Sequence, residues 1–365
     1  MSTAFPLTRR PDPLPEAERE AVLRAPGFGR HFTDHMAVAT WTPDRGWHGR
    51  RIGPREPFSL DPSSAVLHYG QEVFEGLKAY RHPDGGVRLF RPEVNARRFA
   101  RSARRLALPE LPEEDFLASI EELVRADEPW VPSPTGEESL YLRPFMFASE
   151  GFLGVRPATE VTYAVLASPA GPYFPSGVTG VTLWISTTYA RAAEGGTGPA
   201  KCGSNYAAGL AAQVEAREHG CEQVMYLDSA GRGTVEESGT MNLCLVTSEG
   251  QLVTPELGTI LEGVTRDTIL TLAGDHGLTP VERRVTLEEL RSGAADGTVT
   301  EVFAAGTAAV VTPVVGFRGA SEEGEYGFTV GDGSPGPYTV ALRQHVTDIQ
   351  YGRAEDTHGW LRRVL

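Results

Sequence analysis

Residues 195–206 read Gly195-Gly196-Thr197-Gly198-Pro199-Ala200-Lys201-Cys202-Gly203-Ser204-Asn205-Tyr206. Glycines let a large ligand approach the backbone closely, and Lys201 lies among them. An amine in a tight, partly desolvated loop has a lowered pKa, which raises the fraction of free amine that Schiff-base chemistry needs. The segment is not the phosphate loop of nucleotide hydrolases, because that loop has Gly directly before its Lys and Ser or Thr directly after it. The loop therefore predicts either a reactive lysine or an exposed lysine on the surface.

Lysine is rare in this chain. Its 365 residues include 34 Lys and Arg residues, and only Lys78 and Lys201 among them are lysines. An arginine keeps its charge and cannot act as an amine nucleophile, whereas a lysine can. Each lysine is therefore a candidate for amine chemistry, although a bias towards arginine codons explains the same count.

The overall charge and composition exclude several classes of protein. With 48 acidic residues the net charge is −14, which argues against nucleic acid as a partner because phosphate binding needs a clustered positive surface. No run approaches the ~18 apolar residues of a membrane span, and residues 1–6 lack the apolar core of a signal peptide. Cys202, Cys221 and Cys244 are too scattered for a disulfide framework or a zinc site. We expect a cytoplasmic protein with no membrane, nucleic-acid or metal partner.

Hydrophobic periodicity predicts a mixture of strand pairs and helices. Two strand pairs are expected, at 35–52 and at 77–91, the second around a Pro-Asp-Gly-Gly turn. Further strands are expected near 161–165, 222–228, 241–247, 251–254 and 301–304, and helices near 113–127, 206–218, 265–276 and 338–350. A Pro- and Gly-rich stretch follows residue 167 and reads as a junction. We predict two domains of α/β and α+β type, at 1–170 and 188–365, joined by a linker at 171–187.

Three other segments could contact an anion or a cofactor. Glu236 and Glu237 precede an apolar strand, where a carboxylate could hold a protonated pyridine nitrogen, although solvated acids in a turn would look the same. Gly263-Val264-Thr265-Arg266 opens a helix and could offer amides to an anion, or Thr265 could simply cap the helix. Gly306-Thr307-Ala308-Ala309 is a second turn of small residues with amides to offer.

A series of short motifs runs along nearly the whole chain in a fixed order. They are Phe28-Gly29, Phe32-Thr33-Asp34-His35-Met36, Leu67-His68-Tyr69, Phe74-Glu75-Gly76-Leu77-Lys78-Ala79-Tyr80-Arg81, Arg98 with Arg101-Ser102, Tyr141-Leu142-Arg143-Pro144, Gly171-Pro172-Tyr173-Phe174, the Lys201 loop, Gly239-Thr240-Met241-Asn242, Gly263-Val264-Thr265-Arg266, Gly306-Thr307-Ala308 and Thr347-Asp348-Ile349-Gln350-Tyr351-Gly352. In this order the chain resembles the branched-chain amino acid aminotransferases, pyridoxal-phosphate enzymes of fold type IV. The resemblance implies the two-domain, D-amino acid aminotransferase-like fold of that type.

The resemblance also implies a role for each cofactor-binding position. Lys201 matches the lysine that bonds pyridoxal 5′-phosphate and later moves the proton between Cα and C4′. Glu237 matches the acid that pairs with the protonated pyridine nitrogen, and Tyr206 the phenol that contacts O3′. The positions that match the phosphate cradle are Arg98, Val264, Thr265 and Thr307. Arginine suits that task because its planar donors make charge-assisted bonds to phosphate.

Substrate contacts follow from the same resemblance. The positions expected around the substrate are Phe28, Phe74, Tyr141, Arg143, Tyr173, Thr240 and the Ala308 amide, with Tyr69, Leu153 and Val155 supplied by the partner subunit of a homodimer. Aromatic side chains with hydroxyl groups make an apolar pocket that can also hold a carboxylate.

The resemblance predicts a transaminase for leucine, isoleucine and valine. It would transfer their amino groups reversibly to 2-oxoglutarate, giving glutamate and the 2-oxo acids by ping-pong half reactions through pyridoxamine phosphate. Two alternatives stay open: another activity of the fold type, such as D-amino acid transaminase or aminodeoxychorismate lyase, and a non-catalytic protein that binds the cofactor or an amino acid. Where some animal relatives carry a redox pair of cysteines, this chain has Ala309 and Thr312, so we expect no thiol switch of that kind.

Overall fold

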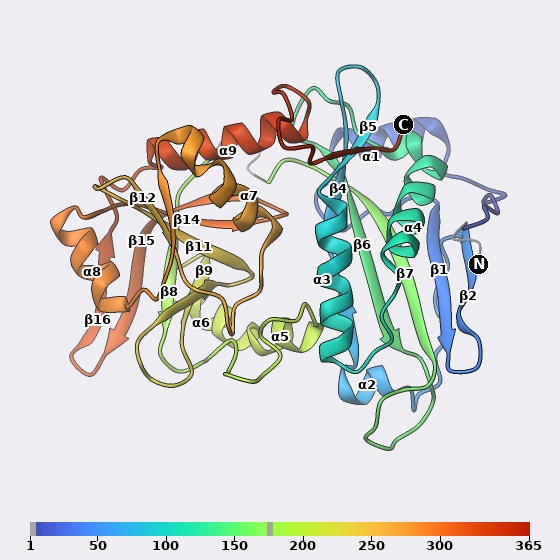
Figure 1. Cartoon of the computed structure of the whole chain (residues 1–365), viewed down its shortest axis with the longest axis horizontal. Coiled ribbons are helices and arrows are strands. Elements are labelled where there is room, and N and C mark those ends of the chain that lie inside the picture. The colour runs from blue at the N-terminus through green and yellow to red at the C-terminus, as the bar shows by residue number, and fades with distance from the viewer. Residues whose placement is uncertain (1–4, 174–177) are drawn as a thin grey trace. The chain divides into compact units, whose positions relative to one another are not determined.

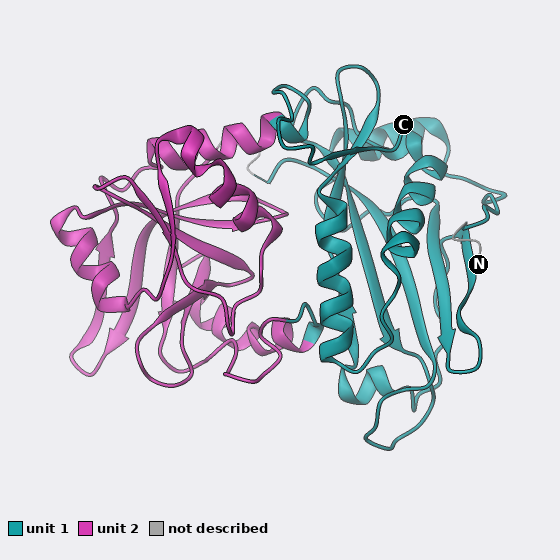
Figure 2. Cartoon of the chain, viewed as in Figure 1, with its two compact units in different colours: residues 1–173, 200–203, 349–365 teal, residues 174–199, 204–348 magenta. Residues whose placement is uncertain are grey.

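The chain divides into two compact units. The computed structural model describes residues 5–173 and 178–365. Unit 1 comprises residues 1–173, 200–203 and 349–365, and unit 2 comprises residues 174–199 and 204–348 (Figure 2). Residues 1–4, and residues 174–177 of the expected linker, lie outside the described residues. The domain limits drawn from the sequence stay a prediction.

Unit 1 is built on an antiparallel sheet. Its strands follow the order β17 (Leu361–Arg363), β5 (Val87–Phe90), β4 (Leu77–Arg81), β6 (Ser139–Ala148), β7 (Val161–Ala170), β1 (His35–Thr42) and β2 (Gly46–Pro54), and β3 (Glu72–Phe74) also pairs with β6. The two strand pairs expected from the sequence are therefore confirmed. The short strand β17 at the end of the chain pairs with β5, which no periodicity indicates.

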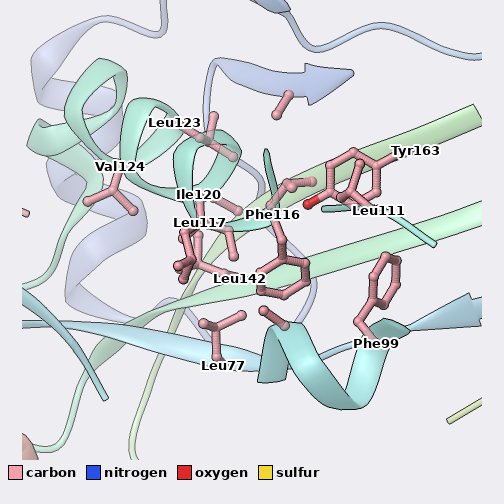
Figure 3. Close-up of a cluster of buried hydrophobic side chains, with 14 of the residues drawn as sticks. Leu77, Phe99, Leu111, Phe116, Leu117, Ile120, Leu123, Val124, Leu142 and Tyr163 are labelled. Carbon is pink, nitrogen blue, oxygen red and sulfur yellow. The ribbon is translucent and has the colours of Figure 1, made fainter. Parts of the chain in front are cut away.

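Two helices bury the core of unit 1. In Figure 1, α3 (Pro92–Arg105) and α4 (Glu113–Ala126) lie along one face of this sheet. Their apolar side chains meet those of the strands in the cluster of Figure 3, where Phe99, Phe116 and Tyr163 pack together. The remaining helices are short: α1 (Glu16–Arg24), α2 (Ala65–Tyr69) and the 3₁₀ turn η1 (Glu128–Trp130). Helix α4 confirms the expected helix at 113–127.

Unit 2 contains a sheet that closes on itself. The strand order is β10 (Val235–Ser238), β9 (Gln223–Leu227), β8 (Val181–Ser186), β15 (Val310–Ser321), β14 (Val299–Gly306), β11 (Met241–Thr247), β12 (Gln251–Thr254) and β13 (Thr279–Glu282), with β16 (Gly324–Thr329) beside β15. Because β10 also pairs with β11, the run from β10 to β11 forms a closed ring. Both antiparallel and parallel pairs occur, as the mixed fold class predicts.

The helices of unit 2 differ from the sequence expectation in two places. They are α5 (Gly203–Ala208), α6 (Leu210–Glu218), α7 (Val264–Leu272) with the 3₁₀ turn η2 (Ala273–His276), α8 (Leu287–Asp296) and α9 (Pro337–Gln350). The helix expected at 206–218 is present in two parts, α5 and α6, which meet at Gly209, and the first part begins earlier, at Gly203. Helix α8 was not expected, although the Thr286 hydroxyl caps it by accepting from the Glu289 amide. Over the described ranges, no helix has the length and apolarity needed to span a bilayer.

Candidate functional site

Lys201 lies on a short segment that is bound into unit 1 from both sides. Its amide donates to Ser102 Oγ at 2.9 Å, and its carbonyl accepts from the Phe74 amide at 3.0 Å. The neighbours Ala200 and Cys202 are buried in the core of unit 1, whereas Lys201 is only partly buried. The Lys201 side chain is therefore less enclosed than those of its two neighbours. The alternative of an exposed surface lysine is wrong.

The amine of Lys201 lies among charged and aromatic groups. Its Nζ is 4.7 Å from the centre of the Phe74 ring. Burial and the nearby Arg98 guanidinium lower the pKa of Lys201 to about 8, against the opposing attraction of the Glu75 carboxylate. A lowered pKa makes the neutral, nucleophilic amine abundant near neutral pH. Lys201 therefore has the lowered pKa that is expected of a reactive lysine.

A pH titration of the lysine signals tests this pKa. With ¹³Cε-lysine labelling the chain gives only two lysine side-chain signals, because Lys78 and Lys201 are its only lysines. In cofactor-free protein we expect one of them to titrate with a midpoint near pH 8, with the amine protonated below it and neutral above it. The Lys201→Met variant assigns the signal by deleting it. Two midpoints near the ordinary lysine value of about 10.4 would contradict the description.

Arg98 is held by an acid that the sequence did not single out. Glu75 is fully buried, and its two oxygens accept from Arg98 Nε at 2.6 Å and Nη2 at 2.8 Å. Asn95 Nδ2 donates to the same carboxylate at 2.8 Å. Burial would raise the pKa of Glu75, and the contacts with Arg98 outweigh it, so the pKa lies below its usual range. Glu75 therefore fixes the position of Arg98 on α3.

Several predicted substrate positions form one continuous group in unit 1. Arg143 lies over the rings of Phe74 and Tyr141, at 4.9 and 5.3 Å, and its Nη2 donates to the Tyr141 hydroxyl at 3.1 Å. Phe28 packs edge-on against Tyr141 with ring centres 5.0 Å apart. Together with Lys201 these side chains combine aromatic surface with positive charge. Such a surface suits an aliphatic molecule that carries a carboxylate.

Four other predicted substrate positions have exposed side chains. The Tyr69 hydroxyl donates to the Leu153 carbonyl, and the side chains of Tyr69, Leu153 and Val155 are 44%, 65% and 87% exposed. Tyr173 is also exposed.

In unit 2, Glu237 lies in a dense set of donors. Its Oε1 accepts from the Leu261 amide at 2.8 Å and from Asn242 Nδ2 at 3.0 Å, and Arg191 Nε lies 3.0 Å from its Oε2. Glu237 is 3% exposed, so these donors take the place of water around a carboxylate. The hairpin that places it turns at Gly239 and Thr240, and Gly239 has φ +54°, which favours glycine. The alternative of a solvated turn acid is wrong for Glu237.

The two small-residue segments lie at an end of a helix and at a strand turn. Val264 and Thr265 begin α7, where backbone amides have no partner within the helix and attract anions. Thr307 and Ala308 lie in the turn between β14 and β15. Tyr206 lies on α5. Within unit 2, a Cβ at Gly263 would lie 2.0 Å from Asn242 Oδ1, so the start of α7 lies close against the partner of Glu237.

Gly198 tolerates no side chain. A Cβ there would lie 2.1 Å from the Thr259 carbonyl oxygen and 2.7 Å from Ala192 Cβ. We expect Gly198→Ala to lower the free energy of unfolding by about 1–3 kcal/mol, the usual cost of overpacking, as measured in urea. The matched control is Gly274→Ala, since a Cβ there meets nothing within 4 Å, and it should leave stability within ~0.5 kcal/mol. Equal effects of the two substitutions would show that the glycine loop is not closely packed.

Sequence reasoning missed the residues that hold the predicted ones. These are Glu75, Asn95 and Ser102 in unit 1 and Arg191 and Asn242 in unit 2. Glu75, Ser102 and Asn242 did stand inside motifs that carry the resemblance, and their place in those motifs was the signal available in the sequence. No motif in the sequence indicated Arg191.

Comparisons with a family model, with related sequences and with solved structures all give the same family. A model of amino-transferase class IV matches residues 72–317. The branched-chain-amino-acid aminotransferase of Mycobacterium tuberculosis (strain ATCC 25618 / H37Rv) is 53% identical over 368 residues, which cover 100% of this chain and 99% of the relative. The branched-chain-amino-acid transaminase 1 of Bacillus subtilis (strain 168) is 44% identical and covers 92% of this chain and 93% of its own.

Solved structures agree in fold. The branched-chain amino acid aminotransferase of Escherichia coli matches with a TM-score of 0.73 at 28% identity, over 90% of this chain and 100% of its own. The branched-chain amino acid aminotransferase of a T.th. strain, solved with pyridoxamine 5′-phosphate, matches with a TM-score of 0.72 at 32% identity, over 90% of this chain and 99% of its own. The chain therefore belongs to the class IV aminotransferases, and within them to the branched-chain-amino-acid aminotransferase family.

Proposed function

We propose that this chain is a branched-chain L-amino acid aminotransferase that moves the amino group of leucine, isoleucine or valine reversibly to 2-oxoglutarate. The observation that carries the proposal is the amine of Lys201, with its pKa lowered to about 8 beside Arg98 and Glu75. Full-length relatives that are 53% identical and bear this name support the substrate class.

The residues of the candidate site fit pyridoxal 5′-phosphate as the cofactor. That group, when bound, supplies an aldehyde that takes up the amino group and a protonated ring that withdraws electrons. The donor set matches it: a lysine with a lowered pKa, a buried carboxylate for a protonated ring nitrogen, and an arginine with helix-terminal amides for a phosphate. We assign the binding of the phosphate to Arg98, Val264, Thr265 and Thr307, and contact with the ring to Tyr206 and Glu237.

Lys201 and Glu237 would have different roles in the reaction: Lys201 would transfer the proton, and Glu237 would stabilise charge on the cofactor ring. Lys201 Nζ would hold the cofactor in the resting enzyme, and as a free amine it would take the proton from the substrate Cα. A pKa near pH 8 suits a group that must both accept and return a proton. Glu237, held by its donors, would stabilise positive charge on the ring nitrogen, which counts most as charge develops at Cα. The amino group is exchanged in two half reactions in ping-pong order.

The substrate side chain would contact an aromatic surface of the protein. The substrate carboxylate would accept hydrogen bonds from protein donors. We assign the apolar contact to Phe28, Phe74, Tyr141 and Tyr173, and carboxylate recognition to Arg143, Thr240 and the Ala308 amide. The same hydrogen-bond donors would bind the carboxylates of glutamate and 2-oxoglutarate in the other half reaction. Discrimination among leucine, isoleucine and valine rests on pocket shape, since one methylene is worth only about 1–3 kcal/mol.

We infer that the enzyme works as a homodimer in the cytoplasm. The exposure of Tyr69, Leu153 and Val155 supports a dimer in which they serve the partner's site, because large apolar side chains that project together often mark an interface. The three cysteines of the described chain are buried and form no disulfide, which suits a reducing compartment.

A substrate panel with purified, cofactor-loaded protein tests the proposed function. We expect transfer from L-leucine, L-isoleucine and L-valine to 2-oxoglutarate, with formation of glutamate. D-alanine and aminodeoxychorismate should react far more slowly. Preference for either of these two compounds would overturn the substrate assignment, and binding of L-leucine without any transfer would favour a non-catalytic protein.

A further inference from the structure

Glu72 contacts the segment that carries Lys201, and none of the roles assigned above includes it. Its Oε1 accepts a hydrogen bond from the Gly203 amide. Gly203 is the first residue of α5, and the amides of the first turn of a helix have no partner within the helix. A carboxylate on strand β3 therefore supplies the acceptor that the helix itself cannot.

Strand β3 is bound to the Lys201 segment at two points. The Phe74 amide donates to the Lys201 carbonyl at 3.0 Å, and Glu72 lies two residues earlier on the same strand. Because β3 is itself paired with β6, both contacts tie the segment to the sheet of unit 1. The Lys201 amide is held separately, by Ser102 Oγ at 2.9 Å. Glu72 thus fixes the chain two residues beyond the lysine.

The glycine at position 203 leaves room for the Glu72 carboxylate. A Cβ on Gly203 would overlap Glu72 Oε1. The φ angle of Gly203 does not lie in the left-handed region, so its backbone conformation does not itself require a glycine. Since the carboxylate occupies the space that a side chain would take, Gly203 and Glu72 fit each other.

Glu72 is partly buried, and this burial has a cost. Burial raises the pKa of Glu72, and the Gly203 bond and the Arg143 charge only partly oppose it. Arg143 also lies over the Phe74 ring, so Glu72 acts beside the predicted substrate group. A carboxylate with a perturbed pKa in such surroundings is typical of a functional site.

We propose that Glu72 is a positioning residue for the amine of Lys201. By accepting from the Gly203 amide it fixes residues 201–203 against β3, and so it keeps the Lys201 side chain in its partly buried place. The task needs an acceptor oxygen, which a glutamine also supplies. The proposal rests on the proposed role of Lys201 and concerns the geometry of the protein before any reaction.

Titration of the ¹³Cε-lysine signals in the cofactor-free, full-length chain tests the proposal. Glu72→Ala should move the Lys201 midpoint from near pH 8 towards the ordinary lysine value. We expect a change of about half a pH unit or more, because a loosened segment admits water to an amine whose pKa is lowered chiefly by burial. Glu72→Gln, which keeps an acceptor oxygen, should lie much closer to the parent. The Lys78 signal is the internal reference.

Gly203→Ala tests the same contact without removing Glu72. The added methyl group should displace the carboxylate, which is the movable end of a long side chain, so the fold should persist and the Lys201 midpoint should move as in Glu72→Ala. Once Glu72→Ala has removed the carboxylate, adding Gly203→Ala should change little, so the two effects should not add. This variant decides the question should Glu72→Ala fold poorly.

Glu150→Ala is the matched control. It removes another carboxylate of unit 1 that holds a backbone amide, since Glu150 Oε2 accepts from the Thr159 amide at 2.6 Å. That contact does not involve the Lys201 segment. Glu150→Ala should therefore leave the Lys201 midpoint unchanged, whatever it costs in stability.

Turnover of the holoenzyme provides a second measurement. Glu72→Ala should lower kcat for L-leucine about ten- to hundredfold, as a misplaced reacting group does, with little change in KM. An unchanged Lys201 midpoint in both Glu72→Ala and Gly203→Ala would overturn the proposal, because Glu72 would then serve the fold alone. Equal shifts in Glu72→Ala and Glu72→Gln would also overturn it, since the charge would then be responsible. The titration needs neither cofactor nor substrate, so its failure is separate from a failure of the proposed function.

Discussion

Lys201→Ala is expected to reduce turnover of L-leucine and 2-oxoglutarate by about 10³-fold or more. The substitution removes both the amine that bonds the cofactor and the base that moves the Cα proton, and a general base alone contributes about 10²–10⁴-fold. The fold should persist, because the packed groups of this segment are Ala200 and Cys202 and the backbone bonds of Lys201 to Ser102 and Phe74 do not involve its side chain. Steady-state assays with thermal unfolding of the same samples separate chemistry from folding.

The matched control for this substitution is Lys78→Arg. Lys78 is the other lysine of the chain and lies on β4, buried at 8% exposure. We place no amine chemistry at it, so turnover should remain close to that of the parent, whatever the larger side chain costs in stability. Near-normal turnover in Lys201→Ala would contradict the assignment of the lysine.

Glu75→Gln is expected to lower the free energy of unfolding by about 3–5 kcal/mol, the usual cost of leaving one partner of a buried ion pair without the other. The variant keeps the shape of the side chain and removes the charge that faces Arg98 Nε and Nη2. The exposed pair of Glu110 with Arg104 provides the control, and Glu110→Gln should leave stability almost unchanged. Urea unfolding of the three proteins measures the difference.

The same variant should change the Lys201 titration. The Glu75 carboxylate raises the pKa of Lys201, so its removal should lower the midpoint further below the ordinary lysine value. The pH dependence of stability should also change. The pKa of Glu75 is lowered in the folded protein, so its contribution is present above the ordinary carboxyl pKa and is lost as the pH falls through the folded value. Glu75→Gln should therefore show less loss of stability in acid. A lysine midpoint that does not move would contradict the coupling of Glu75 to Lys201.

Regular elements with clean periodicity could be predicted from the sequence. The strand pair β4 and β5 has alternating apolar residues around a turn, and helix α4 has a plain apolar stripe. Helix α3 was not predicted because its buried face includes the polar residues Asn95, Arg98 and Ser102. These buried polar residues serve the site, and they hide the apolar period that marks a helix.

In the candidate site, too, some residues could be predicted from the sequence and others could not. Lys201 could be singled out because its residue type is rare and its loop is rich in glycine. Glu75 and Arg191 could not, because each acts through a partner far along the chain, Arg98 and Glu237 respectively. A pairing of this kind leaves no local pattern in the sequence.

The position of the cofactor bond tests the central claim most directly. Purified holoenzyme is reduced with borohydride, digested, and its peptides are analysed by mass spectrometry. We predict a phosphopyridoxyl adduct on the peptide that contains Lys201 and none on the peptide that contains Lys78, the only other lysine. An adduct on Lys78, or no lysine adduct in protein that transfers amino groups, would contradict the assignment of Lys201.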